Sequence, residues 1–226
     1  VQGGYRLELR ELSVREPIVS SQWPHHTIPT AKIEASILAQ MDCKELTIEL
    51  KHQARRLGFT MAGVCPAVPP NNLARFDERL AAGYAGEMSY LRDRRSAYEH
   101  PRHVLDGVRS IVILAMDYRT AEPNQVQPGQ GRVARYAWGS SDYHDLIHDR
   151  LHKLADWLRT VRPESSIRGV VDTAPLMERE FAQLAGLGWI GKNTLLLSPD
   201  AGSYFFLAAL LTELEIVYAA PHTPDH

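Results

Sequence analysis

Cysteine is scarce in this sequence, long apolar runs are missing, and neither sign of charge dominates. Cys43 and Cys65 are the two cysteines of the 226 residues, and because they form no Cys-x-x-Cys pair we interpret them as free thiols. No run of about 18 apolar residues is present, so we expect no membrane-spanning helix. The first residues also lack the pattern of a secretory signal. Together these absences predict a cytoplasmic protein.

The balance of charged residues excludes a strongly basic protein. It carries 25 lysine and arginine residues against 27 aspartate and glutamate residues, a formal net charge of −2. A surface that binds nucleic acid by overall charge alone is therefore not expected. Hydrophobic residues make up 44% and charged residues 23%, which is typical of a globular chain and excludes a disordered one.

The first forty residues differ in composition from the rest. They combine a polar Ser-Ser-Gln run with prolines at a density that helices avoid: Pro17, Pro24 and Pro29. We expect residues 1–40 to be a loosely ordered extension and residues 41–226 to be the folded domain. Val1 is not an initiator residue, and our hypothesis is that the natural start is Met41.

Hydrophobic periodicity predicts helices and strands without the regular alternation of a doubly wound sheet, and so the α+β class. Helices are expected over 44–57, over 73–82 with Asn71 or Asn72 as the cap, from Asp142 to 158, and from near Pro175 to Gly186. Strands are expected over 59–64, 110–116, 132–138, 167–171 and 193–197, with further apolar structure over 203–216. The stretch 121–131 is rich in proline and glycine and is expected to be a loop.

Asp172 is the first candidate for chemistry. It follows the strand predicted over 167–171 and precedes the helix predicted from near Pro175. A carboxyl group at a strand end can point into the mouth of a sheet, where active-site groups often lie. The alternative is that Asp172 caps the helix, which would stabilise it by about 1 kcal/mol. The residues alone leave both interpretations open.

Three histidines recur every four residues on the helix that begins at Asp142: His144, His148 and His152. Such spacing can place imidazoles around a metal ion. It is also typical of half-buried or solvated histidines beside an apolar stripe. We favour the second interpretation and expect no metal held by the protein's side chains.

Two further groups can contact a ligand. Five arginines lie close together in the sequence: Arg92, Arg94, Arg95, Arg102 and Arg109. They can contact phosphates or form solvated surface charge. The glycines of 186–191 can let the backbone approach a bulky flat ligand, although their spacing does not match a phosphate-binding loop.

Six sequence blocks occur in the order found in one known family. They are GYAGEMSYL (83–91), RYAWG (135–139), DYH (142–144), VDTAPLMER (171–179), AGLGWIGKN (185–193) and GSYFFL (202–207). With them the chain resembles the N-terminal half of the epoxyqueuosine reductases, which depend on cobalamin and contain iron–sulfur clusters. The resemblance begins near Glu45, and it implies that residues 41–226 are a cobalamin-binding catalytic domain that stops before the ferredoxin-like 4Fe–4S segment. It implies an open mixed or antiparallel sheet flanked by helices, which binds cobalamin with its lower axial base displaced.

The resemblance also implies an activity and the residues for it. The activity is that of an oxidoreductase in transfer RNA modification, which reduces the epoxide of epoxyqueuosine to queuosine in the anticodon loop. Its partners are that transfer RNA and an external electron donor. Asp172 matches the family's proton donor. The positions that match its cobalamin contacts are Ala134, Asp172, Leu196 and Leu207.

The chain departs from the family's pattern in two ways. Tyr98 stands where the family has an arginine that contacts the corrin, and Arg94 or Arg95 can replace it. The cysteine runs that ligate two 4Fe–4S clusters are not among these 226 residues. We therefore expect the clusters only in a full-length protein, and this fragment alone to be inactive. The alternatives are a paralogous cobalamin-dependent reductase or dehalogenase, and a non-catalytic cobalamin-binding module.

Overall fold

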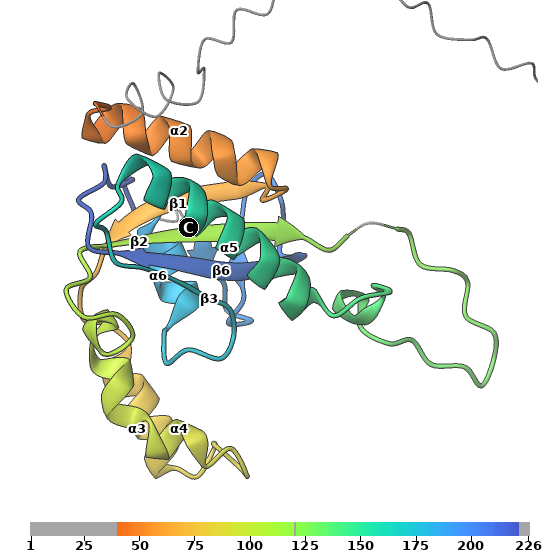
Figure 1. Ribbon diagram of the computed structural model, residues 1–226. Helices are drawn as coiled ribbons and strands as arrows, with labels where there is room; N and C mark the ends of the chain where they lie inside the picture. The colour runs from red at the N-terminus through yellow and green to blue at the C-terminus, as the bar shows by residue number, and fades with distance from the viewer. Residues whose placement is uncertain (1–39, 120, 222–226) are drawn as a thin grey trace, which may run out of the picture.

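The computed structural model describes residues 40–119 and 121–221, which form an open sheet flanked by helices (Figure 1). The sheet has four strands in the order β1, β2, β6, β3, and every neighbouring pair is antiparallel. The strands are β1 (Met61–Pro66), β2 (Ser110–Asp117), β6 (Phe205–Thr212) and β3 (Ile167–Val170). This confirms the predicted α+β class and narrows the sheet to an antiparallel one.

The two central strands are buried on both faces because their apolar residues alternate between two cores. On β2, Val112 and Leu114 contribute to one core, while Ile111 and Ile113 contribute to the other. All four side chains are fully buried. The near-continuous apolar sequence of β2 is therefore explained by its position in the sheet, where both of its faces are buried.

Two helices cover one face of the sheet and one covers the other (Figure 1). Helices α2 (Cys43–Arg56) and α5 (Tyr143–Val161) pack on the first core, and α6 (Glu178–Leu184) packs on the second. A capping box of Asp42 and Glu45 begins α2. The chain leaves α2 through Gly58, whose φ of +88° is strained for other residues.

An arm extends from the sheet between β1 and β2 (Figure 1). It contains α3 (Leu73–Ala81), α4 (Tyr90–Asp93) and the 3₁₀ helices η1 (Arg95–Glu99) and η2 (Pro101–His103). Asn72 stands at the N-cap of α3, as predicted, but it does not cap the helix with its side chain. The Asn72 side chain makes no capping hydrogen bond and donates instead to Glu180 of α6, at 3.1 Å. The arm is thereby tied to the helix beside the second core.

Three other expectations are corrected. The stretch 132–138 is not a strand but contains the 3₁₀ helix η3 (Arg135–Ala137). The strand expected over 193–197 shortens to β5 (Leu196–Leu197), which pairs with β4 (Trp189–Ile190). Helix α6 begins at Glu178 rather than near Pro175. Loop 121–131 carries turns and no helix or strand, as predicted.

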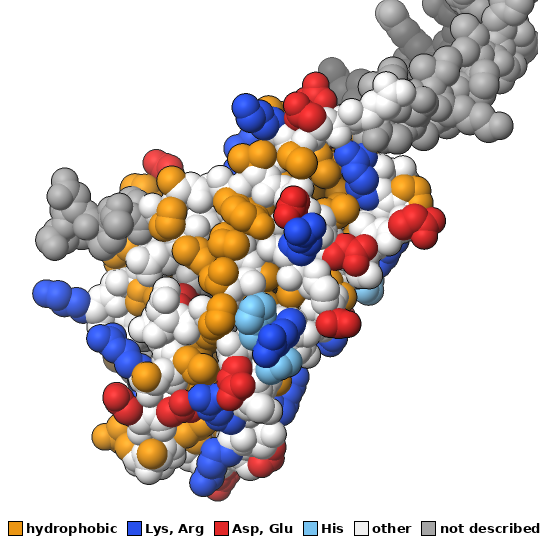
Figure 2. Space-filling model, turned by 90° about the vertical axis from the view of Figure 1, so that its left-hand side faces the viewer, with side chains coloured by type: hydrophobic (Ala, Val, Ile, Leu, Met, Phe, Trp, Pro, Cys, Tyr) orange, Lys and Arg blue, Asp and Glu red, His pale blue; other side chains and the backbone are white. Residues whose placement is uncertain are grey.

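The surface carries charges of both signs. On the face shown in Figure 2, acidic and basic side chains are interspersed, and hydrophobic side chains lie between them. None of the helices within residues 40–119 and 121–221 has the length and apolar character needed to cross a membrane. The extension predicted over 1–40 lies, except for Gln40, outside the described residues, so that boundary stays a prediction.

Candidate functional site

An open cleft of about 280 Å³ lies where β2 ends and β6 begins. Three of the residues predicted from the sequence line it together: Asp172, Leu196 and Leu207. Its other lining residues are Tyr118, Tyr136, Tyr143, Glu178, Arg179, Leu195, Ser203, Phe205 and Phe206. The tertiary structure thus brings residues from seven separate segments to one place.

Asp172 is held in a conformation that few residues adopt. Its φ is +52°, and the Thr173 N–H donates to the Val171 carbonyl oxygen at 2.5 Å, which closes a three-residue turn. A left-handed backbone at a residue other than glycine costs on the order of 1–3 kcal/mol. The helix-capping interpretation is wrong, because α6 begins at Glu178 without a side-chain cap. The turn directs the Asp172 carboxylate to other partners.

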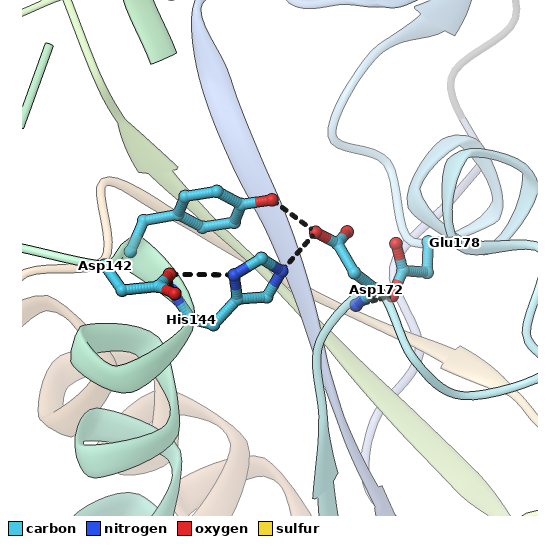
Figure 3. A network of polar contacts seen from close by, with 5 residues as sticks. Asp142, His144, Asp172 and Glu178 are labelled. Carbon is cyan, nitrogen blue, oxygen red and sulfur yellow. Dashed lines mark hydrogen bonds and ion pairs between the residues drawn. The ribbon is translucent and has the colours of Figure 1, made fainter. Parts of the chain in front are cut away.

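Those partners come from the first turn of α5 (Figure 3). The Tyr143 hydroxyl donates to Asp172 Oδ2 at 2.7 Å, and His144 Nε2 lies 3.1 Å from the same oxygen. His144 Nδ1 lies 2.8 Å from Asp142 Oδ1, and Asp142 also caps α5 by accepting the His144 main-chain N–H. His144 therefore bridges two carboxylates. Both of its ring nitrogens can donate at once only when the imidazole is protonated.

The charges around His144 favour that protonated form. Hydrogen bonding to Asp142 raises the pKa of His144 above its ordinary value, burial opposes this, and the charges of Asp142 and Asp172 add to the increase. The sequence analysis grouped His144 with His148 and His152. The structure separates His144 from them by its contact with Asp172. Within residues 40–119 and 121–221, no group of side chains suited to hold a metal ion is found.

Tyr143 was missed by the sequence analysis, although the DYH block contains it. Its ring stacks on Phe206 of β6, with centroids 4.0 Å apart and planes 7° apart. Burial first, and then the hydrogen bond to Asp172, raises the pKa of Tyr143 well above its usual range. The phenol therefore stays protonated at neutral pH and serves as a donor to Asp172.

Glu178 was also missed as a functional residue. It is the first residue of α6, it is half-buried, and its Oε1 accepts the Asp172 main-chain N–H at 3.1 Å (Figure 3). Burial and then the negative charge of Asp172 raise the pKa of Glu178 to about 8. The carboxyl group with the raised pKa therefore lies directly beside the Asp172 turn. Groups with perturbed pKa values gather at functional sites, which marks this turn as a candidate.

The cleft wall is apolar and partly aromatic. Leu196 is buried, Leu207 is half-buried, and Tyr136 and Leu195 are exposed at 53% and 40%. Ala134 does not line the cleft. It begins the turn η3 that carries Tyr136 into the lining.

Two arginines of the arm, Arg94 and Arg95, have different partners. Arg95 is paired with Asp77 and Glu99, whereas Arg94 donates to the Thr173 carbonyl oxygen at 3.0 Å. Of the two arginines expected to replace a missing contact at Tyr98, Arg94 is therefore the one that lies beside the Asp172 turn. Tyr98 itself packs against Phe76, with ring centroids 4.9 Å apart.

The comparisons with known proteins agree with this architecture. Residues 99–173 match the family model described as epoxyqueuosine reductase QueG, DUF1730. The epoxyqueuosine reductase of Gloeobacter violaceus is 41% identical over 176 residues, which cover 77% of this chain and 54% of the relative. The crystal structure of an epoxyqueuosine reductase with an epoxyqueuosine-modified tRNA stem loop has a TM-score of 0.68 at 26% identity, and the match covers 79% of this chain and 48% of that one.

A reductive dehalogenase structure, described as suggesting a mechanism for B12-dependent dehalogenation, shares the fold with a TM-score of 0.56. Its identity is 17%, over 97% of this chain and 29% of that one. The same fold therefore occurs in an epoxyqueuosine reductase and in a reductive dehalogenase. In sequence, the chain is similar to the epoxyqueuosine reductases. It spans about half the length of the curated relatives it matches.

Proposed function

We propose that this chain is the cofactor-facing, proton-delivering part of an enzyme that reduces epoxyqueuosine to queuosine in transfer RNA. The observation that carries the proposal is Asp172, held in a strained turn beside an apolar cleft and hydrogen-bonded to Tyr143 and His144. The identity to curated epoxyqueuosine reductases, and the solved relative with a modified tRNA stem loop, support the substrate.

The cleft fits one face of a cobalamin. A corrin ring is broad and flat, with apolar faces and polar amides at its edge, and sites for such ligands combine apolar walls with a few polar groups. Leu196 and Leu207 offer the apolar wall, Ser203 and Arg179 offer polar groups, and the Ala134 backbone is proposed to contribute from the rim. When bound, a reduced cobalamin supplies the electrons for opening the epoxide. We assign the two 4Fe–4S clusters to the part of the relatives' length that this chain does not span.

The residues of this chain then donate the proton that the reaction needs. Opening an epoxide produces an alkoxide, which must be protonated. Asp172 Oδ2 accepts a hydrogen bond from Tyr143 and lies 3.1 Å from His144 Nε2, so a proton that Asp172 gives up can be replaced from a neighbour. His144 can supply that proton through Nε2, because Asp142 favours its protonated form. We propose that Asp172 is the general acid and that His144 returns a proton to it.

The test uses a full-length protein that contains this chain. The protein is loaded with cobalamin, given a reductant and transfer RNA that carries epoxyqueuosine, and the nucleosides are analysed by mass spectrometry. We expect conversion of epoxyqueuosine to queuosine. If a folded, cobalamin-loaded protein leaves epoxyqueuosine unchanged but removes halide from a haloarene, the chain is a paralogous dehalogenase. If it does neither, the non-catalytic interpretation replaces the proposal.

A further inference from the structure

The turn that carries Asp172 is held from α6 by one carboxyl group. Glu178 Oε1 accepts the Asp172 main-chain N–H at 3.1 Å (Figure 3). We propose that Glu178 is a positioning residue, which keeps the backbone of Asp172 left-handed and so keeps its carboxylate within reach of Tyr143 and His144. The inference deepens the proposed function, since it assigns a residue that acts through the general acid.

Packing alone does not hold Asp172. Its side chain is 46% exposed, and Thr173 beside it is exposed as well. The strand that precedes it ends its pairing with β6 at Val170, so the Asp172 N–H lies beyond the ladder. A strained backbone persists only when its surroundings determine it. Buried Val171 and Ala174 fix the two ends of the turn, and hydrogen bonds have to hold the exposed residues between them.

Glu178, by contrast, belongs to a segment that is packed against the second core. The segment between the two acids is buried at Ala174, Pro175 and Leu176, where it joins the second core beneath the sheet. Glu178 opens α6, whose Phe181 is fully buried. The acceptor oxygen is therefore anchored to the core, and the exposed turn is tied to it through one hydrogen bond.

The protonation state of Glu178 suits this role. Two charged groups face it, Asp172 from the turn and Arg179 from its own helix, and the Tyr98 phenol of the arm lies near enough to be affected by its charge. Burial and the charge of Asp172 raise the pKa of Glu178 to about 8, so near neutrality it is mostly an uncharged acid. An uncharged acid accepts the N–H through its carbonyl oxygen without placing a second negative charge beside Asp172. Glutamine offers the same oxygen and the same charge.

The experiment follows the titration of His144 in the 226-residue chain by NMR, without cofactor or substrate. The His144 resonance is assigned by its loss in His144→Gln. The variants are Glu178→Ala, which removes the acceptor, Glu178→Leu, which removes it but refills the space, and Glu178→Gln, which keeps it. Glu180→Gln is the matched control, since Glu180 binds Asn71 and Asn72 rather than the Asp172 turn.

We expect Glu178→Ala and Glu178→Leu to shift the His144 titration to lower pH, because a released Asp172 no longer stabilises the imidazolium. We expect Glu178→Gln and Glu180→Gln to titrate like the wild type. An unchanged His144 titration in folded Glu178→Leu would overturn the proposal. So would a shift in Glu178→Gln as large as that in Glu178→Leu, since it would show that charge rather than the hydrogen bond matters.

A double variant tests whether Glu178 acts through Asp172. In an Asp172→Asn background, Glu178→Leu should cause no further shift of the His144 titration, because the charge that it positions is already gone. Equal shifts in both backgrounds would overturn the assignment. This readout needs neither cobalamin nor RNA. Its failure would therefore leave the reductase proposal intact, and failure of the reductase assay would leave this result intact.

Discussion

At the scale of residues, the site is a chain of proton-carrying groups arranged around one oxygen. Asp172 Oδ2 receives the Tyr143 hydroxyl at 2.7 Å and lies 3.1 Å from His144 Nε2, while Glu178 holds the backbone. Tyr143 cannot release its proton at neutral pH, whereas His144 and Glu178 carry exchangeable ones. Chemistry at this site therefore depends on which acid is protonated when an alkoxide forms.

The first prediction concerns Asp172 itself. Asp172→Asn in the full-length protein keeps an oxygen that can accept from Tyr143 but removes the acidic proton. We expect the rate of single-turnover epoxyqueuosine reduction to fall by on the order of 100-fold or more, as for the loss of a general acid. Cobalamin binding and the melting temperature should change little. Turnover near that of the wild type in a folded variant would contradict the proposed role.

The second prediction concerns pH and the stability contributed by Glu178. Its pKa is raised in the folded state to about 8 from the ordinary value of 4.5, so the unfolded chain loses this proton first as pH rises. The free energy of unfolding should therefore fall between pH 4.5 and 8, by at most about 1.4 kcal/mol per pH unit from this group. Glu178→Gln should remove that loss, and the variant should be the more stable protein at pH 8.

Urea denaturation of both proteins at several pH values measures this difference. Because the other titrating groups are common to both, the difference between the two curves isolates Glu178. Parallel curves would show that the carboxyl group ionises in the folded state as it does in water.

At the scale of elements, the glycine-rich segment 186–191 packs the chain against itself. A Cβ at Gly188 would lie 2.0 Å from the Leu197 carbonyl oxygen, across the β4–β5 pair. The sequence analysis expected these glycines to admit a flat ligand, but the close approach at Gly188 is to the backbone of β5. The glycine matters for the site indirectly, because β5 carries Leu196 into the cleft wall.

The third prediction follows from that contact. Gly188→Ala should lower the free energy of unfolding by about 1–3 kcal/mol or more, because the added methyl group overpacks a backbone contact. Gly131→Ala is the control, since a Cβ there meets nothing within 4 Å and its φ is not positive. Urea denaturation of both variants checks the difference. Equal stabilities would mean that β4 and β5 separate freely to admit a side chain.

At the scale of the whole molecule, the cleft lies at one end of an antiparallel sheet whose two cores support it from both faces. Helix α5 packs on the first core and presents Tyr143 and His144, while α6 packs on the second and presents Glu178. The Asp172 turn lies between these two layers. Cofactor binding should therefore depend mainly on the folded sheet domain, with Arg94 of the arm placed beside the Asp172 turn.

The fourth prediction is that the 226-residue chain binds cobalamin by itself. Titration with cob(II)alamin, followed by electron paramagnetic resonance, should show the signal of the base-off form. Leu207→Glu, which places a charge in the half-buried wall, should weaken binding, whereas Arg92→Ala on the arm should not. Failure of the folded wild-type chain to bind would contradict the cofactor assignment for this part of the protein.

Much of the fold could be predicted from the sequence because local signals determined it. The apolar run of β2, the stripe of Ile147, Leu151 and Leu158 on α5, and the Asp142 cap are each readable within a few residues. The predictions failed where a distant partner decides. Asn72 stands at the N-cap of α3, but its side-chain amide donates to Glu180, more than one hundred residues away, and makes no capping hydrogen bond.

The same division applies to the site. The residues by themselves indicated Asp172, which follows a strand, and the family resemblance implied Leu196 and Leu207 beside it. Only the tertiary structure decided what surrounds them. The Asp172 backbone has a φ of +52°, and its carboxylate does not cap α6. The carboxylate contacts the first turn of α5 instead, which lies beside the end of β3. The partnership of Asp172 with Tyr143, His144 and Glu178 arises because proton affinity depends on burial and on nearby charge, and both are properties of the packed molecule rather than of the chain.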